Sequence, residues 1–133
     1  MKKPSVNLPC PCGSGLKYKK CCLRYHKGAT APDALHLMRS RYTAYAVGNS
    51  RYIIQTTHPD NPEYSSDIPN WEEEILNFCR HTGFLGLRIE SFTENREEAF
   101  VTFTAKLSSG EMREKSRFLK QNGRWLYVSG EVH

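Results

Sequence analysis

The sequence predicts an α+β protein in which three helices pack on a curved four-stranded antiparallel sheet, with a small zinc knuckle ahead of them. Two observations predict this architecture. Apolar residues recur at the helical period as far as about residue 81, and at the two-residue period of strands from Phe84 onward. Four of the five cysteines fall within the first 22 residues. Since one face of the sheet must be buried and the helices are the only cover, helices and sheet should form two packed layers.

The cysteine-rich segment has the spacing of a metal site. Two cysteines one residue apart are followed, eight residues later, by two adjacent ones: Cys10, Cys12, Cys21 and Cys22. Four thiolates suit one tetrahedral zinc ion, whose Zn–S bonds of about 2.3 Å require the sulfurs to approach within about 4 Å of one another. The glycines between the pairs can turn the chain back, and residues 16–20 could form a short helical turn. Because four thiolates fill the coordination sphere, the site should be structural rather than catalytic.

Two alternatives to this ligand set stay open. His26 is near enough in sequence to replace Cys22 as the fourth ligand. Two disulfides could form instead, although Cys21 and Cys22 are awkward partners and disulfides belong mostly to oxidising compartments. The fifth cysteine, Cys79, stands alone and is expected to act as a small buried apolar residue.

Positive charge is concentrated in the same segment. Residues 1–28 hold seven Lys or Arg and no acidic residue, whereas residues 29–133 hold twelve basic and fourteen acidic residues, so the formal charge of +5 originates in the first segment. These basic residues could offset the anionic metal cluster and lower thiol pKa values. They could equally present a cationic face to an acidic protein or to phosphates. The candidate docking patch consists of Lys17, Lys19, Lys20 and Arg24.

No segment has the character of a signal peptide, and none approaches the roughly 20 apolar residues of a membrane span. Lys2 and Lys3 are followed by Pro4 and a polar stretch. We therefore expect a cytoplasmic protein of bacterial type, in a reducing compartment that leaves thiols free to bind a metal.

Residues 29–32 are small and loop-prone, and they are predicted to separate two domains, 1–28 and 29–133. A helix capped by Asp33 should run to about Val47. A second helix, capped by Ser50, should cover residues 51–57. A loop over residues 60–70, broken by prolines, should lead to a third helix over residues 71–81.

The second half of the chain alternates apolar and polar residues. Strands are predicted over residues 84–90, 100–107, 111–120 and 124–130. The dipeptide Asn122-Gly123 is a strong signal for a two-residue hairpin between the last two. The expected result is an antiparallel meander.

The segment from Cys10 to Cys22, which begins CPCGSG and ends KYKKCC, resembles the SEC-C motif, named for the carboxy-terminal tail of the SecA translocation motor. In the SecA form the last ligand is often His, where this sequence has Cys22. The resemblance suggests an acidic protein partner, such as a SecB-like chaperone or a ribosome-associated protein.

Nearly the whole chain resembles the YchJ-like family. The similarity includes the order of helices and strands and the stretches LMRSRY at 37–42, THP at 57–59 and SRFLKQNGRW at 116–125. Members combine SEC-C motifs with a middle domain of the nuclear-transport-factor-two-like (NTF2-like) type. The resemblance implies a cone-like, cystatin-type sheet wrapped around helices, with a cavity that some proteins of this fold use for catalysis.

Six residues are candidates for the lining of such a cavity: Arg39, Tyr42, Tyr45, His58, Arg117 and Trp125. His58 and Asp60 could form an acid–base pair, but His58 could instead stabilise a helix end and Asp60 could be a turn residue. The two tyrosines lie on the apolar stripe of the first long helix and could simply be packed. No nucleophile elbow, phosphate loop or paired-carboxylate pattern occurs, so no catalytic residue is assigned.

The sequence thus favours a zinc-binding, non-enzymatic adaptor or binding protein whose basic metal knuckle docks on an acidic partner. Nucleic-acid binding through the same patch is an alternative, with Tyr18 and Tyr25 as stacking candidates. A small lyase, isomerase or hydrolase in the cone is a further alternative, and it would require His58 and Arg39 to face an open pocket.

Overall fold

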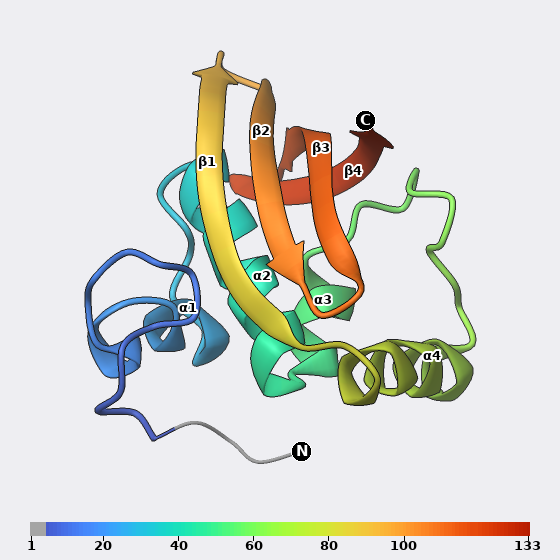
Figure 1. Ribbon diagram of the computed structural model, residues 1–133. Coiled ribbons are helices and arrows are strands. Elements are labelled where there is room, and N and C mark those ends of the chain that lie inside the picture. Colours follow the sequence, from blue (N-terminus) through green and yellow to red (C-terminus); the bar gives the residue numbers. More distant parts are fainter. Residues whose placement is uncertain (1–4) are drawn as a thin grey trace.

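The computed structural model describes residues 5–133 and confirms the α+β architecture, with helices first and a four-stranded antiparallel sheet after them (Figure 1). The basic residues Lys2 and Lys3 lie outside the described residues. The cysteine segment contributes a short 3-10 turn and one short helix, and three longer helices and four strands follow. The bounds are η1 Tyr18–Lys20, α1 Leu23–His26, α2 Ala34–Val47, α3 Ser50–Gln55, α4 Ile68–Arg80, β1 Phe84–Glu94, β2 Glu98–Leu107, β3 Gly110–Gln121 and β4 Arg124–Val132.

Capping side chains fix where α2 and α3 begin. Asp33 caps α2 as predicted, because its carboxylate accepts a hydrogen bond from the His36 amide at 2.7 Å. The prediction that Ser50 caps the next helix is wrong. Asn49 accepts from the Tyr52 amide at 3.1 Å, and Ser50 is already the first helical residue.

The third long helix, α4, begins at Ile68, ahead of the predicted start at Trp71. Asp67 caps it by accepting from the Asn70 amide at 3.3 Å. Pro69, which was predicted to lie in the preceding loop, occupies the first turn, where an amide would have no intrahelical acceptor. None of the helices in residues 5–133 is long and apolar enough to cross a membrane.

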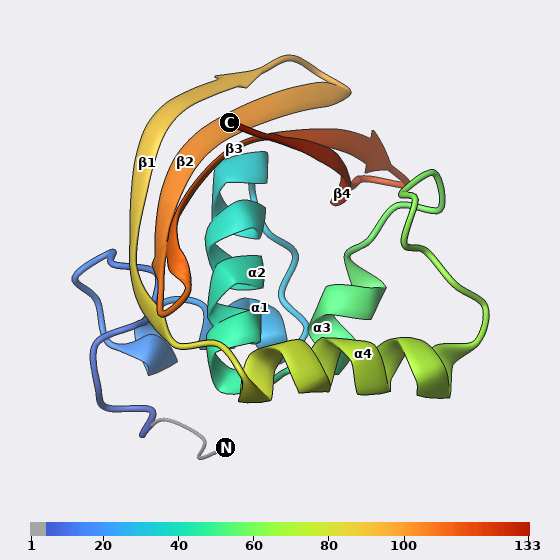
Figure 2. The same cartoon turned by 45° about the vertical axis from the view of Figure 1, so that its right-hand side comes forward.

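The strands pair in the order β1-β2-β3-β4, each antiparallel to its neighbour. The predicted hairpin turn joins β3 to β4, with φ of 53° at Asn122 and 78° at Gly123. Register irregularities in β1 and β4 add to the bend of the sheet. The sheet curves around α2, while α3 and α4 lie at its open side, which gives the cone that the resemblance implied (Figure 2).

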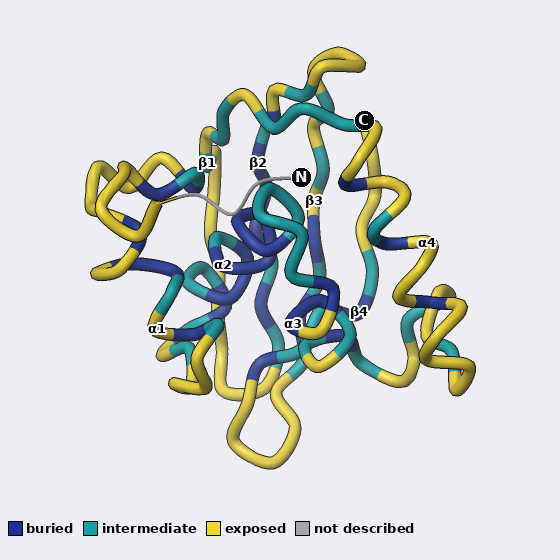
Figure 3. The backbone as a smooth tube through the Cα atoms, turned by 90° about the horizontal axis from the view of Figure 1, so that it is seen from below, coloured by how far each residue is buried: buried dark blue, intermediate teal, exposed yellow. Residues whose placement is uncertain are grey.

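The core lies between α2 and the concave face of the sheet. Most of α2 is buried because the sheet encloses it (Figure 3). Leu37 and Met38 of this helix share one apolar cluster with Val101 and Phe118 of the two central strands. Phe118 is fully buried and is the largest side chain of which this is true in residues 5–133.

The cysteine segment packs against the body of the protein. Tyr25 of α1 belongs to the main core cluster, and Leu87 of β1 packs against the cysteines. The loop over residues 29–32 joins the cysteine segment to the rest of the chain. The division into domains 1–28 and 29–133 stays a prediction, but the two parts share side-chain contacts.

Candidate metal centre and ligand cavity

The loop between the two cysteine pairs folds back on itself. The Cys10 amide donates to the Leu16 carbonyl at 2.8 Å, which closes the loop. Gly13 and Gly15 have φ of 78° and 86°, a left-handed conformation that a Cβ would make costly. The turn η1 follows, and it delivers Cys21 to the first pair, as the sequence predicted.

The four sulfurs of this loop converge. All four cysteines are buried, and their Sγ atoms lie within 4.8 Å of one another. The Cys12 and Cys21 sulfurs are 3.6 Å apart, and the Cys21 and Cys22 sulfurs are 3.9 Å apart. A tetrahedral site with Zn–S bonds of about 2.3 Å has sulfurs about 3.8 Å apart. The cluster can therefore hold a metal ion, whereas a disulfide of about 2.05 Å joins none of the described cysteines.

The thiols of the cluster differ in acidity. Hydrogen bonds from Cys10 and then Cys22 hold the pKa of the Cys12 thiol well below its usual range. The pKa of Cys22 is raised, because that thiol donates to Cys10 and Cys12 and is buried. Burial also raises the pKa of Cys21 to about 11. Since a metal binds thiolates, its binding would release the remaining protons and would weaken in acid.

His26 is occupied elsewhere. Its Nε2 lies 2.9 Å from the Ser40 carbonyl, which can only accept, so Nε2 carries the proton. Nδ1 then accepts from the Tyr18 hydroxyl at 2.7 Å. Both ring nitrogens are used, and the structure brings Cys22 rather than His26 into the sulfur cluster. Burial lowers the pKa of the His26 imidazole.

Helix α2 supports the sulfur cluster from outside. Arg39 Nη1 donates to the Cys12 carbonyl at 2.9 Å and lies 3.9 Å from the Cys12 sulfur. Thr43 Oγ1 lies 3.6 Å from the Cys10 sulfur. Residues four apart share a helix face, so one side of α2 holds both cysteines of the first pair. Contacts of this kind orient metal ligands, and their loss typically weakens metal binding by about 10–100-fold.

The predicted docking patch lies on the outer side of the knuckle. Lys17, Lys19 and Lys20 are exposed, and none of them forms an ion pair with any residue in 5–133. Arg24 is exposed but tethered, because its Nε donates to the Cys21 carbonyl at 3.1 Å and its guanidinium lies over the Tyr25 ring. Three of the four predicted residues are thus free to contact a partner.

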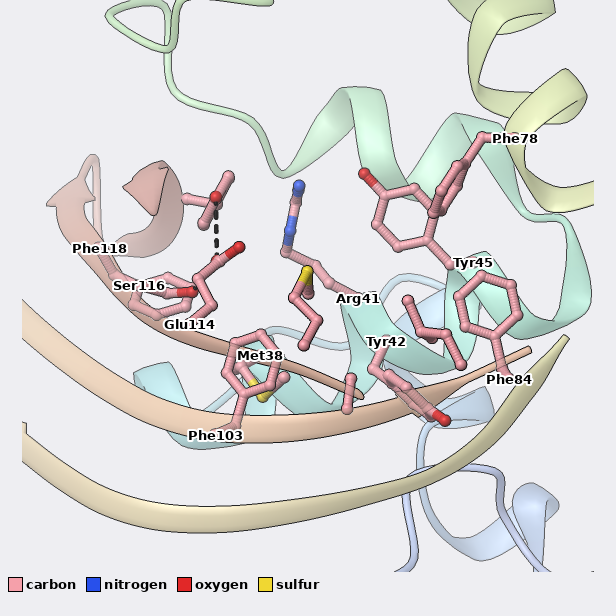
Figure 4. Close-up of a pocket in the computed structure, with 14 residues that line it drawn as sticks. Met38, Arg41, Tyr42, Tyr45, Phe78, Phe84, Phe103, Glu114, Ser116 and Phe118 are labelled. Carbon is pink, nitrogen blue, oxygen red and sulfur yellow. Dashed lines mark hydrogen bonds between the residues drawn. The ribbon is translucent and has the colours of Figure 1, made fainter. Parts of the chain in front are cut away.

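A cavity of about 200 Å³ lies between α2 and the inner face of the sheet (Figure 4). Aromatic and aliphatic side chains form most of its wall. The cavity opens into a wider hollow of about 640 Å³ between α4, the loop before it and β4. The two share Tyr45, Phe78, Glu114 and Tyr127. An apolar cavity with few polar groups is the usual form of a small-molecule site.

The polar groups of this cavity come from α2 and the last two strands. Arg41 Nη1 donates to the Ile53 carbonyl at 3.0 Å and to two threonine hydroxyls, so it closes the C-terminal end of α3. Glu114 Oε2 accepts from the Tyr127 hydroxyl at 3.2 Å and from the Ser116 hydroxyl. Burial, and then the negative charge of Glu114, raise the pKa of Tyr127.

Of the six predicted cavity residues, Tyr42 and Tyr45 lie in the cavity wall. Arg39 faces the cysteine knuckle instead, because it is offset by one position from the inward-facing Met38. Trp125 is buried beside Tyr25 at the far side of the core, in a separate small hollow.

The remaining predicted residues lie outside the cavity wall. Arg117 forms an ion pair with Glu98 at 2.7 Å, on the other face of the sheet from the cavity. His58 and Asp60 do lie together, with the Asp60 amide donating to His58 Nδ1 at 3.0 Å and the carboxylate 3.9 Å away. Since neither His58 nor Arg39 lines the cavity, the arrangement that an enzyme in the cone required is not present.

The sequence interpretation overlooked Arg41 and Glu114 as cavity residues. Arg41 is three residues after Met38 and four before Tyr45, the spacing of one helix face, so its position was accessible from the sequence. Glu114 lies two residues from both Met112 and Ser116 along β3, so all three side chains point to the inward face of the sheet. Glu114 could have been recognised from the sequence as a charged residue at a strand position that is expected to face inward.

The fold and the two sites define a class of protein, a four-cysteine knuckle packed on a cone-shaped α+β domain that encloses a cavity. The chain belongs to the YchJ family: the model of the YchJ middle, NTF2-like domain matches residues 33–130, and the SEC-C motif model matches residues 7–24.

Relatives support the same assignment. The chain is 40% identical over 128 residues to a UPF0225 protein of Enterobacter sp. (strain 638), with 91% of this chain and 81% of that protein covered. The solution structure of a SEC-C motif protein from Rhodopseudomonas palustris is similar, with a TM-score of 0.79, 32% identity, and coverage of 93% of this chain and 98% of that one. A SEC-C motif protein from Psychrobacter arcticus gives a TM-score of 0.75 and 29% identity, with 93% of this chain and 82% of that one covered.

Proposed function

We propose that the protein is a zinc-binding, non-enzymatic adaptor whose basic knuckle docks on an acidic protein. Zinc is supported by the donor set, because four buried thiolates at tetrahedral spacing select a soft ion. The four cysteines would fill its coordination sphere and would leave no position for a substrate. Zinc would therefore order the knuckle rather than perform chemistry.

The observation that carries the docking proposal is the group Lys17, Lys19 and Lys20. These side chains are exposed on one small loop, and the chain has no acidic residue before Asp33 to neutralise them. A compact patch of unpaired positive charge steers acidic partners and discriminates against basic ones. Because a bound metal and the contacts from α2 would hold the loop in place, a partner would not have to order it on binding.

The proposed partner is an acidic protein such as a SecB-like chaperone or a ribosome-associated protein, met in a cytoplasm that keeps thiols reduced. Binding of the zinc-loaded protein to immobilised SecB tests this at two salt concentrations. We expect binding at 0.05 M salt and its loss at 1 M, where the screening length falls to about 3 Å. The variant Lys17→Gln/Lys19→Gln/Lys20→Gln should lose binding at low salt as well.

The matched control removes the same charge from the sheet, in the variant Lys106→Gln/Lys115→Gln/Lys120→Gln, whose three lysines are also exposed. That protein should bind like the native one. Equal binding by both triple variants, or by protein stripped of zinc, would contradict the proposal. If single-stranded RNA were retained in place of SecB, with a steep salt dependence that the knuckle variant abolishes, the same patch would serve nucleic acid instead.

A further inference from the structure

The cavity contains a buried cation without a carboxylate partner. Arg41 is 7% exposed, and it takes part in none of the ion pairs among residues 5–133. Its Nη1 makes all of its hydrogen bonds, while Nε and Nη2 donate to no described residue. A guanidinium stays charged, and a buried charge lacking a counter-ion is costly. An anionic group on a bound molecule would remove that cost.

A carboxylate with a free oxygen lies on the same wall. Glu114 accepts two hydroxyl hydrogen bonds, both through Oε2, and Oε1 accepts none from the described residues. Tyr127 links the two charges, because Arg41 Cζ is 4.6 Å from the centre of its ring and its hydroxyl donates to Glu114. The wall therefore offers two guanidinium nitrogens and one carboxylate oxygen that have no hydrogen-bond partner in residues 5–133, beside a single tyrosine.

The rest of the cavity is apolar. Phe103 and Phe118 line one side of it, and Phe84 lies on the other side beside Phe78, which also borders the wider hollow (Figure 4). The Tyr45 hydroxyl also faces this space and makes no hydrogen bond within residues 5–133. At about 200 Å³ the cavity is smaller than the roughly 300–1,000 Å³ of sites for drug-sized molecules, so it suits one small compound.

We propose that this cavity binds a small zwitterion of the amino-acid type with an apolar or aromatic side chain. The ligand carboxylate would accept from Nε and Nη2 of Arg41, and its ammonium group would donate to Oε1 of Glu114. Its side chain would pack among the phenylalanines. This proposal is independent of the zinc site and of the docking patch.

Gly130 keeps the charged end of the site open. A Cβ at this position would meet the Glu114 carboxylate and would lie 2.6 Å from the Tyr127 hydroxyl oxygen. A side chain there must displace the pair that holds Glu114 in place, so Gly130→Ala should disturb the site without touching the buried core. It provides a variant that leaves the structural bonds of Arg41 intact.

Isothermal titration of the zinc-loaded protein with three related probes tests the proposal. L-phenylalanine carries both charges, 3-phenylpropanoate lacks the ammonium group, and 2-phenylethylamine lacks the carboxylate. We expect saturable binding of L-phenylalanine, at least about 10-fold tighter than either analogue, since each analogue lacks one of the two charge-assisted hydrogen bonds. Glu114→Gln should remove the preference over 3-phenylpropanoate, and Gly130→Ala should weaken all binding.

The matched control is Glu111→Gln, which removes an exposed carboxylate from the same strand and should bind like the native protein. Equal affinity for L-phenylalanine and 3-phenylpropanoate would overturn the zwitterion assignment. Absence of saturable binding for all three probes, or L-phenylalanine binding unaffected by both Glu114→Gln and Gly130→Ala, would overturn the site itself.

Discussion

Arg39 and Arg41 are two residues apart on α2 and point to opposite sides of it. Arg39 donates to the Cys12 carbonyl beside the sulfur cluster, and Arg41 lies in the wall of the cone cavity. Each helical residue is rotated by about 100° from the one before, so residues i and i+2 lie on nearly opposite faces. One helix thus supports the metal centre with one arginine and the cavity with the other.

The first prediction concerns Arg39. Arg39→Ala should weaken zinc binding by about 10–100-fold, because the cysteine loop loses a contact that orients it. Competition with a chromophoric chelator measures this. Arg51→Ala, which removes an exposed arginine from α3, serves as the control and should leave zinc affinity unchanged. Unchanged affinity in Arg39→Ala would show that the loop is oriented without Arg39.

The second prediction concerns removal of the metal. Cys10→Ser or a strong chelator should unfold residues 5–25, because the loop has almost no apolar core apart from its ligands. The sheet should stay folded but be destabilised by about 2–3 kcal/mol, the contribution of burying an aromatic side chain such as Tyr25. Hydrogen exchange would report both effects. The control Cys79→Ala should keep the loop protected, and protection of the loop in the metal-free protein would contradict the coupling.

The third prediction concerns pH. Burial holds the pKa of His26 below its ordinary value of 6.5, so the unfolded chain takes up its proton first. The contribution of His26 is therefore complete above about pH 6.5 and is lost as the pH falls toward its folded-state pKa. Protonation of Nδ1 would also remove the acceptor for the Tyr18 hydroxyl.

Urea unfolding from pH 7.5 to 5.0, at saturating zinc, measures this loss. His26→Gln should lower stability at pH 7.5 and give a shallower pH dependence than the native protein, after correction for any zinc released. A variant curve parallel to the native one would assign the pH dependence to other groups.

The fourth prediction concerns the core. Phe118→Ala should reduce the free energy of unfolding by about 3–5 kcal/mol, because it removes a fully buried ring and leaves a cavity. Phe92→Ala, at a position that is 36% exposed on β1, should cost much less. If chemical denaturation showed the same loss of unfolding free energy for both variants, the concave face of the sheet would not be the centre of the core.

Features encoded by local spacing were predictable from the sequence. The four cysteines, the Asp33 cap and the Asn122-Gly123 turn each depend on a few neighbouring residues, and each lies where the sequence placed it. The start of α4 was misplaced because proline was interpreted as a break, although the first helical turn accepts it.

The cavity was harder to predict, because its polar groups are brought together by the fold. Arg41 and Glu114 belong to a helix and a strand far apart in the chain, and Tyr127 joins them only once β4 has paired with β3. No local pattern links such residues. Choosing Arg39 over Arg41 changed the helix face, since a shift of two positions reverses the direction of a side chain.

Tyr25 is packed in the main core, and this packing has a practical consequence for fragments of this protein. A polypeptide that starts at the loop over residues 29–32 would lack this ring and would leave Leu37, Tyr52 and Trp125 uncovered. Bare aromatic surface of that kind promotes self-association in water. Aggregation of such a shortened polypeptide would reflect the loss of the Tyr25 side chain rather than a property of the intact protein.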